Sequence, residues 1–245
     1  MARAGRERRA GLSLACLGLG LAVSLANPVR AQPVELELVL AVDVSVSVDP
    51  TEYALQIAGL AYAIRDPNVQ AAIAAVGNEG IAVSVIQWGE GLQQRVAIDW
   101  HHLVDSESIE SFARAVERSP RHFSGNGTSI SAAMAYAAKT FEGNGFDGRR
   151  RVIDVSGDGR NNSGLVPPLV RDRLVAQGIV INALAILDGD DGLGLYFQNE
   201  VIGGTASFVV TAVGFEDFAE AMRRKLLHEI QAPVAGDPAI GEPAG

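Results

Sequence analysis

Residues 36–52, which read LELVLAVDVSVSVDPTE, decide the fold of this chain. Leu36 to Val42 is a nearly continuous apolar run, which is typical of a strand buried on both faces. The segment Asp49-Pro50-Thr51-Glu52 then supplies a helix N-cap, a proline at the first helical position and the glutamate of a capping box. A buried strand followed closely by a helix is the repeating unit of a parallel α/β sheet.

The rest of the chain repeats this alternation of apolar runs and helical patterns. Helical spacing of apolar residues continues the first helix to Ile64 and recurs in 106–118, 129–141, 165–177 and 215–230. Apolar runs predict strands at 81–88, 94–100, 151–156, 179–187 and 206–213, with a hairpin turn at 89–91. The pattern predicts an α/β fold over residues 34–231: a doubly wound, mostly parallel sheet with helices on both faces and one antiparallel edge hairpin strand.

The two ends of the chain differ in composition from this domain. A basic start with four arginines within residues 3–9 precedes an apolar run at 11–26, and Val29-Arg30-Ala31 resembles an A-x-A cleavage site. We expect residues 1–31 to be a secretory signal peptide, which places the mature protein in the periplasm or outside the cell. The apolar run is shorter than the roughly 20 residues that span a bilayer, so no stable membrane span is expected after cleavage. Residues 232–245, built mainly of Ala, Pro and Gly, are expected to form a disordered tail.

The composition restricts the class of ligand. The chain carries 29 acidic and 20 basic side chains, a formal charge of −9, and without residues 1–31 the counts are 28 and 15, a charge of −13. An acidic domain is a poor partner for nucleic acid, which requires a basic face. The single cysteine excludes a disulfide scaffold. A metal ion or a cationic ligand suits this charge better.

Three polar segments fall at turns that a parallel sheet would bring to one edge. They are Asp43 to Ser47 after the first strand, Gly125 to Ser129 before the central helix, and Ser156 to Gly159 after the fourth strand. Ligands of such sheets bind outside the carboxyl ends of the strands. Because all three segments offer oxygen atoms and none offers sulfur or imidazole, they suit a hard divalent cation such as Mg²⁺. If the chain stays extended, Asp43, Ser45 and Ser47 also point to the same side.

The three segments resemble the metal-ion-dependent adhesion site of the von Willebrand factor A domains. That site combines a D-x-S-x-S motif after the first strand with a threonine from a second loop and an aspartate after the fourth strand. The overall pattern is most similar to a group of exported bacterial A-type domains. One departure is Ser156-Gly157-Asp158, where Thr-Asp-Gly would be more familiar in the family. The residues that match the motif in order are Asp43, Ser45, Ser47, Thr128 and Asp158.

The resemblance implies a Rossmann-like domain that binds another protein through a metal ion. The hydroxyls of Ser45, Ser47 and Thr128 would coordinate Mg²⁺, or alternatively Mn²⁺ or Ca²⁺. Asp43 and Asp158 would act directly or through water, and one coordination position would remain for an acidic side chain of the partner. The implied protein is a binding module and not an enzyme.

Each of these residues also has an ordinary structural explanation, which the sequence leaves open. Asp43 and Asp158-Gly159 are suited to turns at strand ends, and Thr128 to a helix N-cap. Ser45 and Ser47 are equally explained as ordinary polar loop residues. Asp154, a carboxylate inside an apolar strand, is explained either by contact with a hydroxyl ligand of the metal or by a position at a strand edge. The segment Asp188 to Gly192 is expected to be a solvated loop, because it lacks the closing glutamate of a calcium loop.

A rival class, the haloacid-dehalogenase-like phosphohydrolases, also places an aspartate after the first strand. Residues 157–162, GDGRNN, are partly similar to their GDG-x-N-D segment, and Lys139 is a candidate for their lysine. Their mechanism needs a second aspartate two residues after the first as general acid. Here Ser45 occupies that position, and Asn162 replaces the final acid. We therefore expect metal-dependent binding, with magnesium-dependent phosphate hydrolysis as the alternative.

Overall fold

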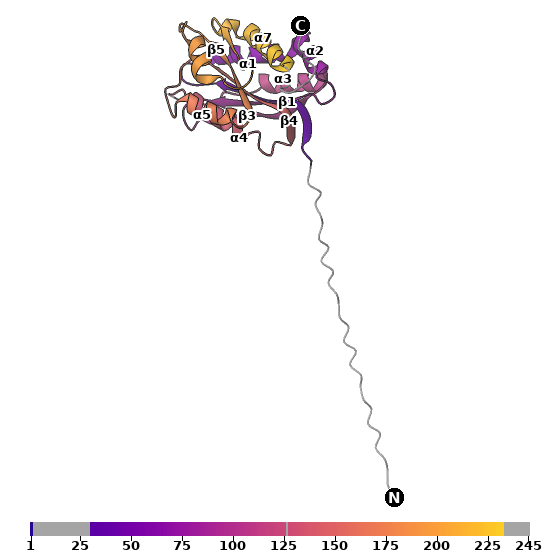
Figure 1. The fold of residues 1–245 in the computed structure, drawn as a ribbon. Helices are drawn as coiled ribbons and strands as arrows, with labels where there is room; N and C mark the ends of the chain where they lie inside the picture. Colours follow the sequence, from indigo (N-terminus) through magenta and orange to yellow (C-terminus); the bar gives the residue numbers. More distant parts are fainter. Residues whose placement is uncertain (2–29, 126, 233–245) are drawn as a thin grey trace, which may run out of the picture. The chain divides into compact units, whose positions relative to one another are not determined.

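A six-stranded sheet runs through the part of the chain that the computed structural model describes, which is Met1 and residues 30–125 and 127–232 (Figure 1). Its strands are β1 (Gln32–Asp43), β2 (Ile81–Trp88), β3 (Gln94–Leu103), β4 (Phe146–Gly157), β5 (Ile179–Ile186) and β6 (Val209–Ala212). The strand order is β3-β2-β1-β4-β5-β6, and all neighbours are parallel except β2 and β3. The predicted doubly wound sheet with one antiparallel edge strand is confirmed.

The chain divides into two units, Met1–Arg30 and Ala31–Gly245. The predicted signal peptide at 1–31 and the predicted tail at 232–245 lie almost entirely outside the described residues. Within the described residues, no helix has the length and the apolar character needed to cross a membrane.

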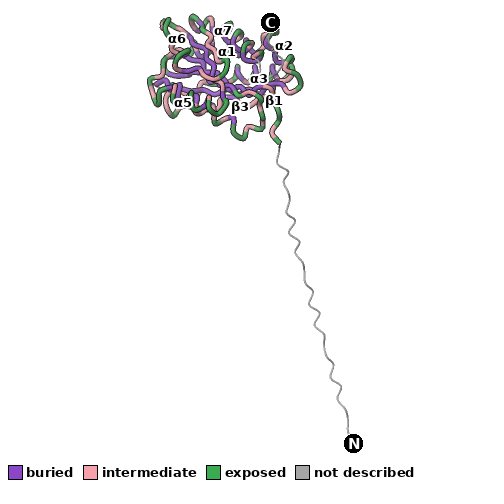
Figure 2. The backbone as a smooth tube through the Cα atoms, viewed as in Figure 1, coloured by how far each residue is buried: buried purple, intermediate pink, exposed green. Residues whose placement is uncertain are grey.

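Helices cover both faces of the sheet (Figure 1). They are α1 (Pro50–Arg65), α2 (Pro67–Ala75), α3 (Ser106–Glu117), α4 (Ile130–Lys139), α5 (Pro167–Val175), α6 (Leu193–Tyr196) and α7 (Phe218–Gln231). Side chains alternate along β1 between the two layers. Leu36, Leu38 and Leu40 pack in a buried cluster with α1, α2, α3 and α7, whereas Val39 and Ala41 pack on the opposite face with α4, α5 and α6. Figure 2 shows the sheet as the most continuously buried part of the domain. Full burial of a Leu or Val side chain stabilises a fold by roughly 1.5–3 kcal/mol, so β1 is held from both sides.

α1 begins where the sequence predicts. Asp49 Oδ1 accepts hydrogen bonds from Thr51 N at 2.6 Å and Glu52 N at 2.9 Å, and Glu52 Oε2 accepts one from Asp49 N at 2.6 Å. This capping box, with Pro50 at the start of the helix, determines where the helix begins. Because β1 ends at Asp43, only a short segment joins the strand to the helix at the carboxyl edge of the sheet.

Several element boundaries differ from those that the sequence predicts. β1 and β4 start earlier, at Gln32 and Phe146, because their N-terminal ends pair with each other beyond the buried centre of the sheet. The sequence does not predict α2 or α6. β6 starts at Val209, later than expected, because Ala206 has a φ of 58°, a left-handed conformation that a strand cannot contain.

The strand order places a topological switch point beside β1. The chain passes from β1 to β2 on one side and later returns to β4 on the other side. In sheets of this kind, ligand sites lie at the carboxyl ends of the strands that flank the switch point. A ligand site is therefore expected at the loops after β1 and β4.

Candidate metal centre

Asp43 is the last residue of β1 and is completely buried. Its Oδ1 accepts a hydrogen bond from Ser45 N at 2.7 Å, and this bond stabilises the turn at the start of the loop. The loop does not stay extended, because Val48 N donates to Ser45 O at 3.2 Å and closes a turn. The turn nevertheless brings the two serines together, and the Oγ atoms of Ser45 and Ser47 lie 3.2 Å apart.

Thr128 and Asp158 reach the same hydroxyls from two other loops. Thr128 Oγ1 lies 3.4 Å from Ser45 Oγ, and Ser47 Oγ donates a hydrogen bond to Asp158 Oδ1 at 2.8 Å. Ser45 and Thr128 are buried, whereas Ser47 is exposed and Asp158 is half-buried. The five oxygen-bearing side chains that the sequence singles out therefore form one contiguous group.

Two side chains that no sequence pattern predicts hold the first loop in place. Arg121 Nη2 donates to Val44 O at 3.0 Å and to Ser45 O at 2.9 Å. Gln56, which is buried in α1, donates from Nε2 to Asp43 O at 3.2 Å. No local sequence pattern marks Arg121 or Gln56, because their partners are main-chain carbonyls in a distant segment.

Thr128 is held by Asn162 and does not cap α4. Asn162 Oδ1 accepts a hydrogen bond from Thr128 N at 2.8 Å, and Asn162 N donates to Thr128 O at 3.0 Å. The N-cap of α4 is Ser129, and it makes no side-chain capping bond. The N-cap explanation for Thr128 is therefore wrong, and its hydroxyl faces Ser45 instead. The position of Asn162 shortly after β4 is the one sequence signal that marks it.

The carboxylate of Asp43 is in an electrostatically unfavourable position. Its Oδ2 is buried and has no hydrogen-bond partner among the described residues. Burial, with a smaller contribution from the negative charge of Asp158, raises the pKa of Asp43 from 3.8 to about 8. Burial also raises the pKa of Asp158, and the hydrogen bond from Ser47 partly opposes this change. A proton or a cation beside Oδ2 relieves the cost of the buried charge.

A glycine keeps space open at Asp43 Oδ2. A Cβ atom on Gly157 would lie 2.9 Å from this oxygen and 3.3 Å from the Trp88 ring. Two carboxylates and three hydroxyls are a donor set that fits Mg²⁺, Mn²⁺ or Ca²⁺, since all three prefer oxygen ligands. Within residues 30–125 and 127–232 there is no group of three His, Cys, Asp or Glu side chains that could hold a metal. A metal at this place therefore depends on the hydroxyls.

Asp154 has neither of the two roles that the sequence suggested. β4 is an inner strand of the sheet, and Asp154 is only 1% exposed. Its Oδ2 lies 3.1 Å from Lys225 Nζ, which also lies 2.8 Å from Glu229 Oε1. Asp154 is thus part of a buried ion-pair group that joins β4 to α7.

The loop 188–192 is largely exposed, as the sequence predicts, and Asp190 ties it to a neighbouring loop. Arg160 Nε lies 2.9 Å from Asp190 Oδ2, which ties the loop after β5 to the loop after β4. Gly192 N also donates to Asp190 Oδ1 at 2.9 Å. The loop therefore borders the edge of the sheet that carries the candidate centre.

The phosphohydrolase alternative is not favoured by this arrangement. Lys139 is the last residue of α4, and the first turn of this helix follows Ser129 at the site. At 1.5 Å per residue, Lys139 lies about 15 Å along the helix from that turn, too far to serve the carboxylates. Asn162, the counterpart of the final acid, is bonded to the main chain of Thr128.

A single family model covers most of the chain. The family is described as "Protein of unknown function (DUF1194)", and it matches residues 33–234. The chain belongs to this family. No curated protein matches the sequence.

Solved structures show that the fold is that of the von Willebrand factor A domains. Proximal thread matrix protein 1 from the mussel byssus matches with a TM-score of 0.61 and 16% identity, over 82% of this chain and 49% of that one. The von Willebrand factor type A structure from Catenulispora acidiphila has a TM-score of 0.55 and 17% identity, over 80% and 43% of the two chains. The vWF domain of the type V pili tip protein Mfa5 from Porphyromonas gingivalis has a TM-score of 0.55 and 11% identity, over 79% and 94%.

The matches differ in how much of the other protein they cover. The chain spans about half the length of the mussel protein, covering 49% of it. A further structure of the mussel protein carries a zinc-occupied MIDAS motif.

Proposed function

We propose that this protein is an exported module that binds another protein through a divalent metal ion, Mg²⁺ or alternatively Mn²⁺ or Ca²⁺. The observation that carries the proposal is the group of five side chains around the unpartnered Oδ2 of Asp43. Ser45, Ser47 and Thr128 hold the ion through their hydroxyls, and Asp43 and Asp158 act directly or through water. The signal peptide at 1–31 directs the domain at 34–231 to the periplasm or the outside of the cell.

A divalent cation fits the electrostatics of this group. Asp43 and Asp158 together supply two negative charges, and their mutual repulsion contributes to the raised pKa of Asp43. A cation between them removes that repulsion and neutralises the buried charge. Three neutral hydroxyls fill only part of the oxygen shell that such an ion takes. When bound, the ion supplies attraction for one more carboxylate, which the partner provides.

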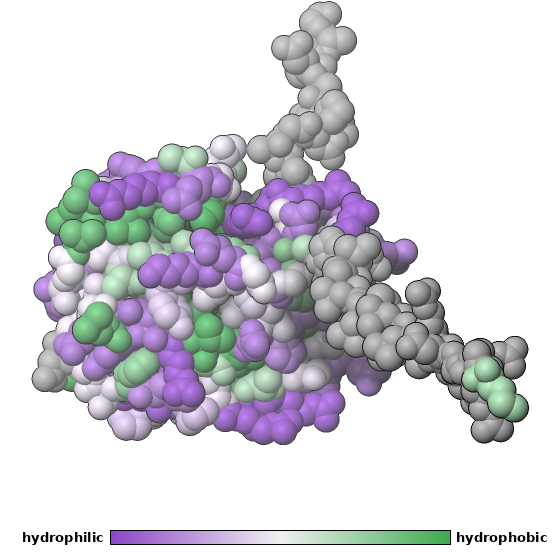
Figure 3. Space-filling view, turned by 90° about the horizontal axis from the view of Figure 1, so that it is seen from below, coloured by the Kyte–Doolittle hydropathy of each residue, from purple (hydrophilic) through white to green (hydrophobic). Residues whose placement is uncertain are grey.

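The surroundings of the site suit a protein partner. Most of the strongly exposed large apolar side chains in the described residues follow the carboxyl ends of strands, on the edge that carries the site. Exposed apolar side chains on the same edge as a binding site add to the surface that a protein partner can cover. Figure 3 shows apolar residues gathered toward one end of the face that it presents. The residues on this edge are Val46, Leu92, Leu165, Val166, Leu169, Leu195 and Val213.

Two proteins of the same fold support the proposal by analogy. The mussel byssus protein has been solved with zinc in its MIDAS motif, which is a divalent metal at the corresponding kind of site. Mfa5 is a type V pili tip protein, and its vWF domain shares this fold. Both analogies rest on the shared fold.

The metal part of the proposal is tested by calorimetric titration of the metal-free protein with Mg²⁺ and Mn²⁺. We expect saturable binding to the wild type and none to Asp43→Asn, which removes the buried charge without changing the shape of the side chain. Asp191→Asn is the matched control, because Asp191 is an exposed acid in a nearby loop. Binding that survives Asp43→Asn, or no binding by the wild type, would contradict the proposal.

Partner binding is separated from catalysis in a second experiment. Immobilised protein is exposed to an envelope extract with Mg²⁺ or with EDTA. The same partner should be retained only with Mg²⁺, by the wild type and Asp191→Asn and not by Asp43→Asn. A different result would be that the protein hydrolyses p-nitrophenyl phosphate with Mg²⁺, loses this activity in Asp43→Asn and captures no partner. That result would contradict the binding function and support the phosphohydrolase alternative.

A further inference from the structure

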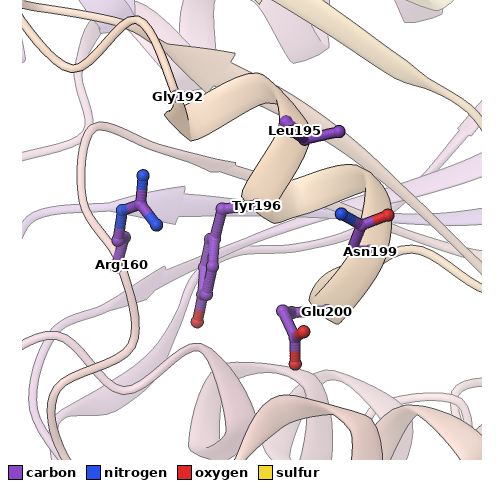
Figure 4. A pocket seen from close by; sticks show the side chains of 6 residues that line it. All are labelled: Arg160, Gly192, Leu195, Tyr196, Asn199 and Glu200. Atoms are coloured by element: carbon purple, nitrogen blue, oxygen red, sulfur yellow. The ribbon is translucent and has the colours of Figure 1, made fainter.

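A pocket lies beside the candidate metal centre, between the loop after β4 and the helical segment that starts with α6 (Figure 4). Its volume of about 290 Å³ is close to the lower limit of pockets that hold small ligands. One wall comes from the residue two positions after Asp158, and the other comes from α6 and the π-helical turn Phe197–Val201 that continues it. The lining residues are Arg160, Gly192, Leu195, Tyr196, Asn199 and Glu200.

An ion pair closes one side of the pocket. Arg160 Nε and Nη2 donate to the two carboxylate oxygens of Asp190 at 2.9 and 3.2 Å. A Cβ atom on Gly192 would lie 2.9 Å from Arg160 Nη2, so this glycine leaves room for the pair. The bidentate contact neutralises the charge of Arg160. The guanidinium carbon also lies 5.2 Å from the centre of the Tyr196 ring, so one face of this ring already contacts a cation.

Glu200 supplies the remaining charge of the pocket. Within residues 30–125 and 127–232 its half-buried carboxylate has no hydrogen-bond or ion-pair partner. Burial raises the pKa of Tyr196, and the negative charge of Glu200 adds to this, so the carboxylate acts on the ring electrostatically. Leu195, which is 67% exposed, adds apolar surface. A carboxylate, an aromatic ring and an apolar side chain suit the charged head and the aliphatic stem of a lysine or arginine.

The pocket and the metal-site loops are joined through Asn161. Asn161 N donates to Tyr196 Oη at 3.1 Å, and Asn161 Oδ1 accepts a hydrogen bond from Ser131 N at 3.2 Å. The next residue, Asn162, holds Thr128. These contacts connect the pocket to the loops that carry the group of candidate metal ligands.

We propose that this pocket binds a lysine or arginine side chain of the same partner whose carboxylate binds the metal. The shared partner rests on the proposed function, whereas the affinity of the pocket for a basic side chain does not. Without residues 1–31 the chain has a formal charge of −13, which repels a purely acidic partner. A basic residue close to the acidic one offsets this repulsion and makes recognition specific.

The pocket is tested with two probes of the same shape and different charge, Nα-acetylarginine methylamide and Nα-acetylcitrulline methylamide. The measurement follows the backbone amide signals of Asn161 and Gly192 by NMR of the ¹⁵N-labelled, metal-free protein. The arginine probe should shift both signals saturably at millimolar concentration, which is the range expected for a single side chain. The citrulline probe should leave them unchanged.

Two matched variants identify the charge that is responsible. Glu200→Gln should weaken binding of the arginine probe about two- to fivefold, the effect of one partly exposed charge pair. Glu142→Gln removes an equal charge from an exposed position after α4 and should have no effect. Equal shifts with both probes, or equal affinity of both variants for the arginine probe, would contradict the proposal that the pocket binds a basic side chain. Because no metal is present, this result is independent of the titration with Mg²⁺.

The shared partner is tested with peptides in which aspartate and arginine are separated by zero to four glycines. Each peptide is compared with its citrulline counterpart in the presence of Mg²⁺. One spacing should bind about tenfold more tightly than its counterpart, because the second contact becomes intramolecular. If no spacing gives an advantage while the arginine probe still binds, the pocket is an independent cation site and the shared partner is wrong.

Discussion

Replacing Asp43 by asparagine should stabilise the metal-free protein at neutral pH and abolish metal binding. The Asp43 carboxylate is completely buried, its Oδ2 has no partner among the described residues, and its pKa is about 8. In the unfolded chain the pKa of an aspartate is about 3.9. Each unit of difference corresponds to about 1.4 kcal/mol of unfolding free energy.

The direction of the effect follows from which state binds the proton more tightly. The folded pKa lies above the unfolded value, so the stability that Asp43 contributes is fully present below about pH 4 and is lost as the pH rises toward 8. At pH 7 the loss amounts to about 4 kcal/mol relative to pH 4. Asparagine does not titrate, so the variant escapes this loss.

Thermal unfolding in EDTA at pH 5 to 8 measures the effect, with Asp191→Asn as the control of equal charge. For a domain of this size 1 kcal/mol corresponds to about 2–4 °C, so Asp43→Asn should melt about 10 °C above the wild type at pH 7. The difference should shrink to a few degrees at pH 5. Saturating Mg²⁺ should raise the melting temperature of the wild type and the control only. A difference between Asp43→Asn and the wild type that does not change with pH would refute this reasoning.

Lys225→Met should destabilise the fold by about 3–5 kcal/mol in urea unfolding, because it leaves the buried Asp154 without its counter-charge. Adding Asp154→Asn to Lys225→Met should recover part of the lost unfolding free energy. If the effects of the two substitutions are simply additive, Asp154 and Lys225 do not interact as an ion pair. Gly157→Ala should lower Mg²⁺ affinity about tenfold or more while circular dichroism stays unchanged, because the added Cβ would lie 2.9 Å from Asp43 Oδ2. Calorimetry at several pH values should show Mg²⁺ affinity rising about tenfold per unit from pH 6 to 7 and levelling off above pH 8, because the ion must displace a proton whose pKa is about 8. An affinity that is independent of pH would show that Asp43 is already ionised in the metal-free protein.

The sequence alone was sufficient to predict the sheet and the grouping of the side chains at the candidate centre. The bounds of β2 and the capping box of α1 were predicted correctly, because both signals arise between neighbours in the chain. That parallel strands end at a common edge is a property of the fold class, so the grouping of Asp43, Thr128 and Asp158 could be expected before any contact was known.

Only the tertiary structure decided which groups hold these side chains and which charges are paired. Arg121 bonds the main chain of the first loop, Asn162 bonds Thr128, and Lys225 pairs with Asp154. Each contact joins segments that meet only when the helices pack on the sheet. The strength of such a contact depends on its burial and on the position of the partner atom, and residues adjacent in the sequence carry no information about either. For that reason the ion pair of Asp154 with α7 could not be read from the apolar strand in which Asp154 lies.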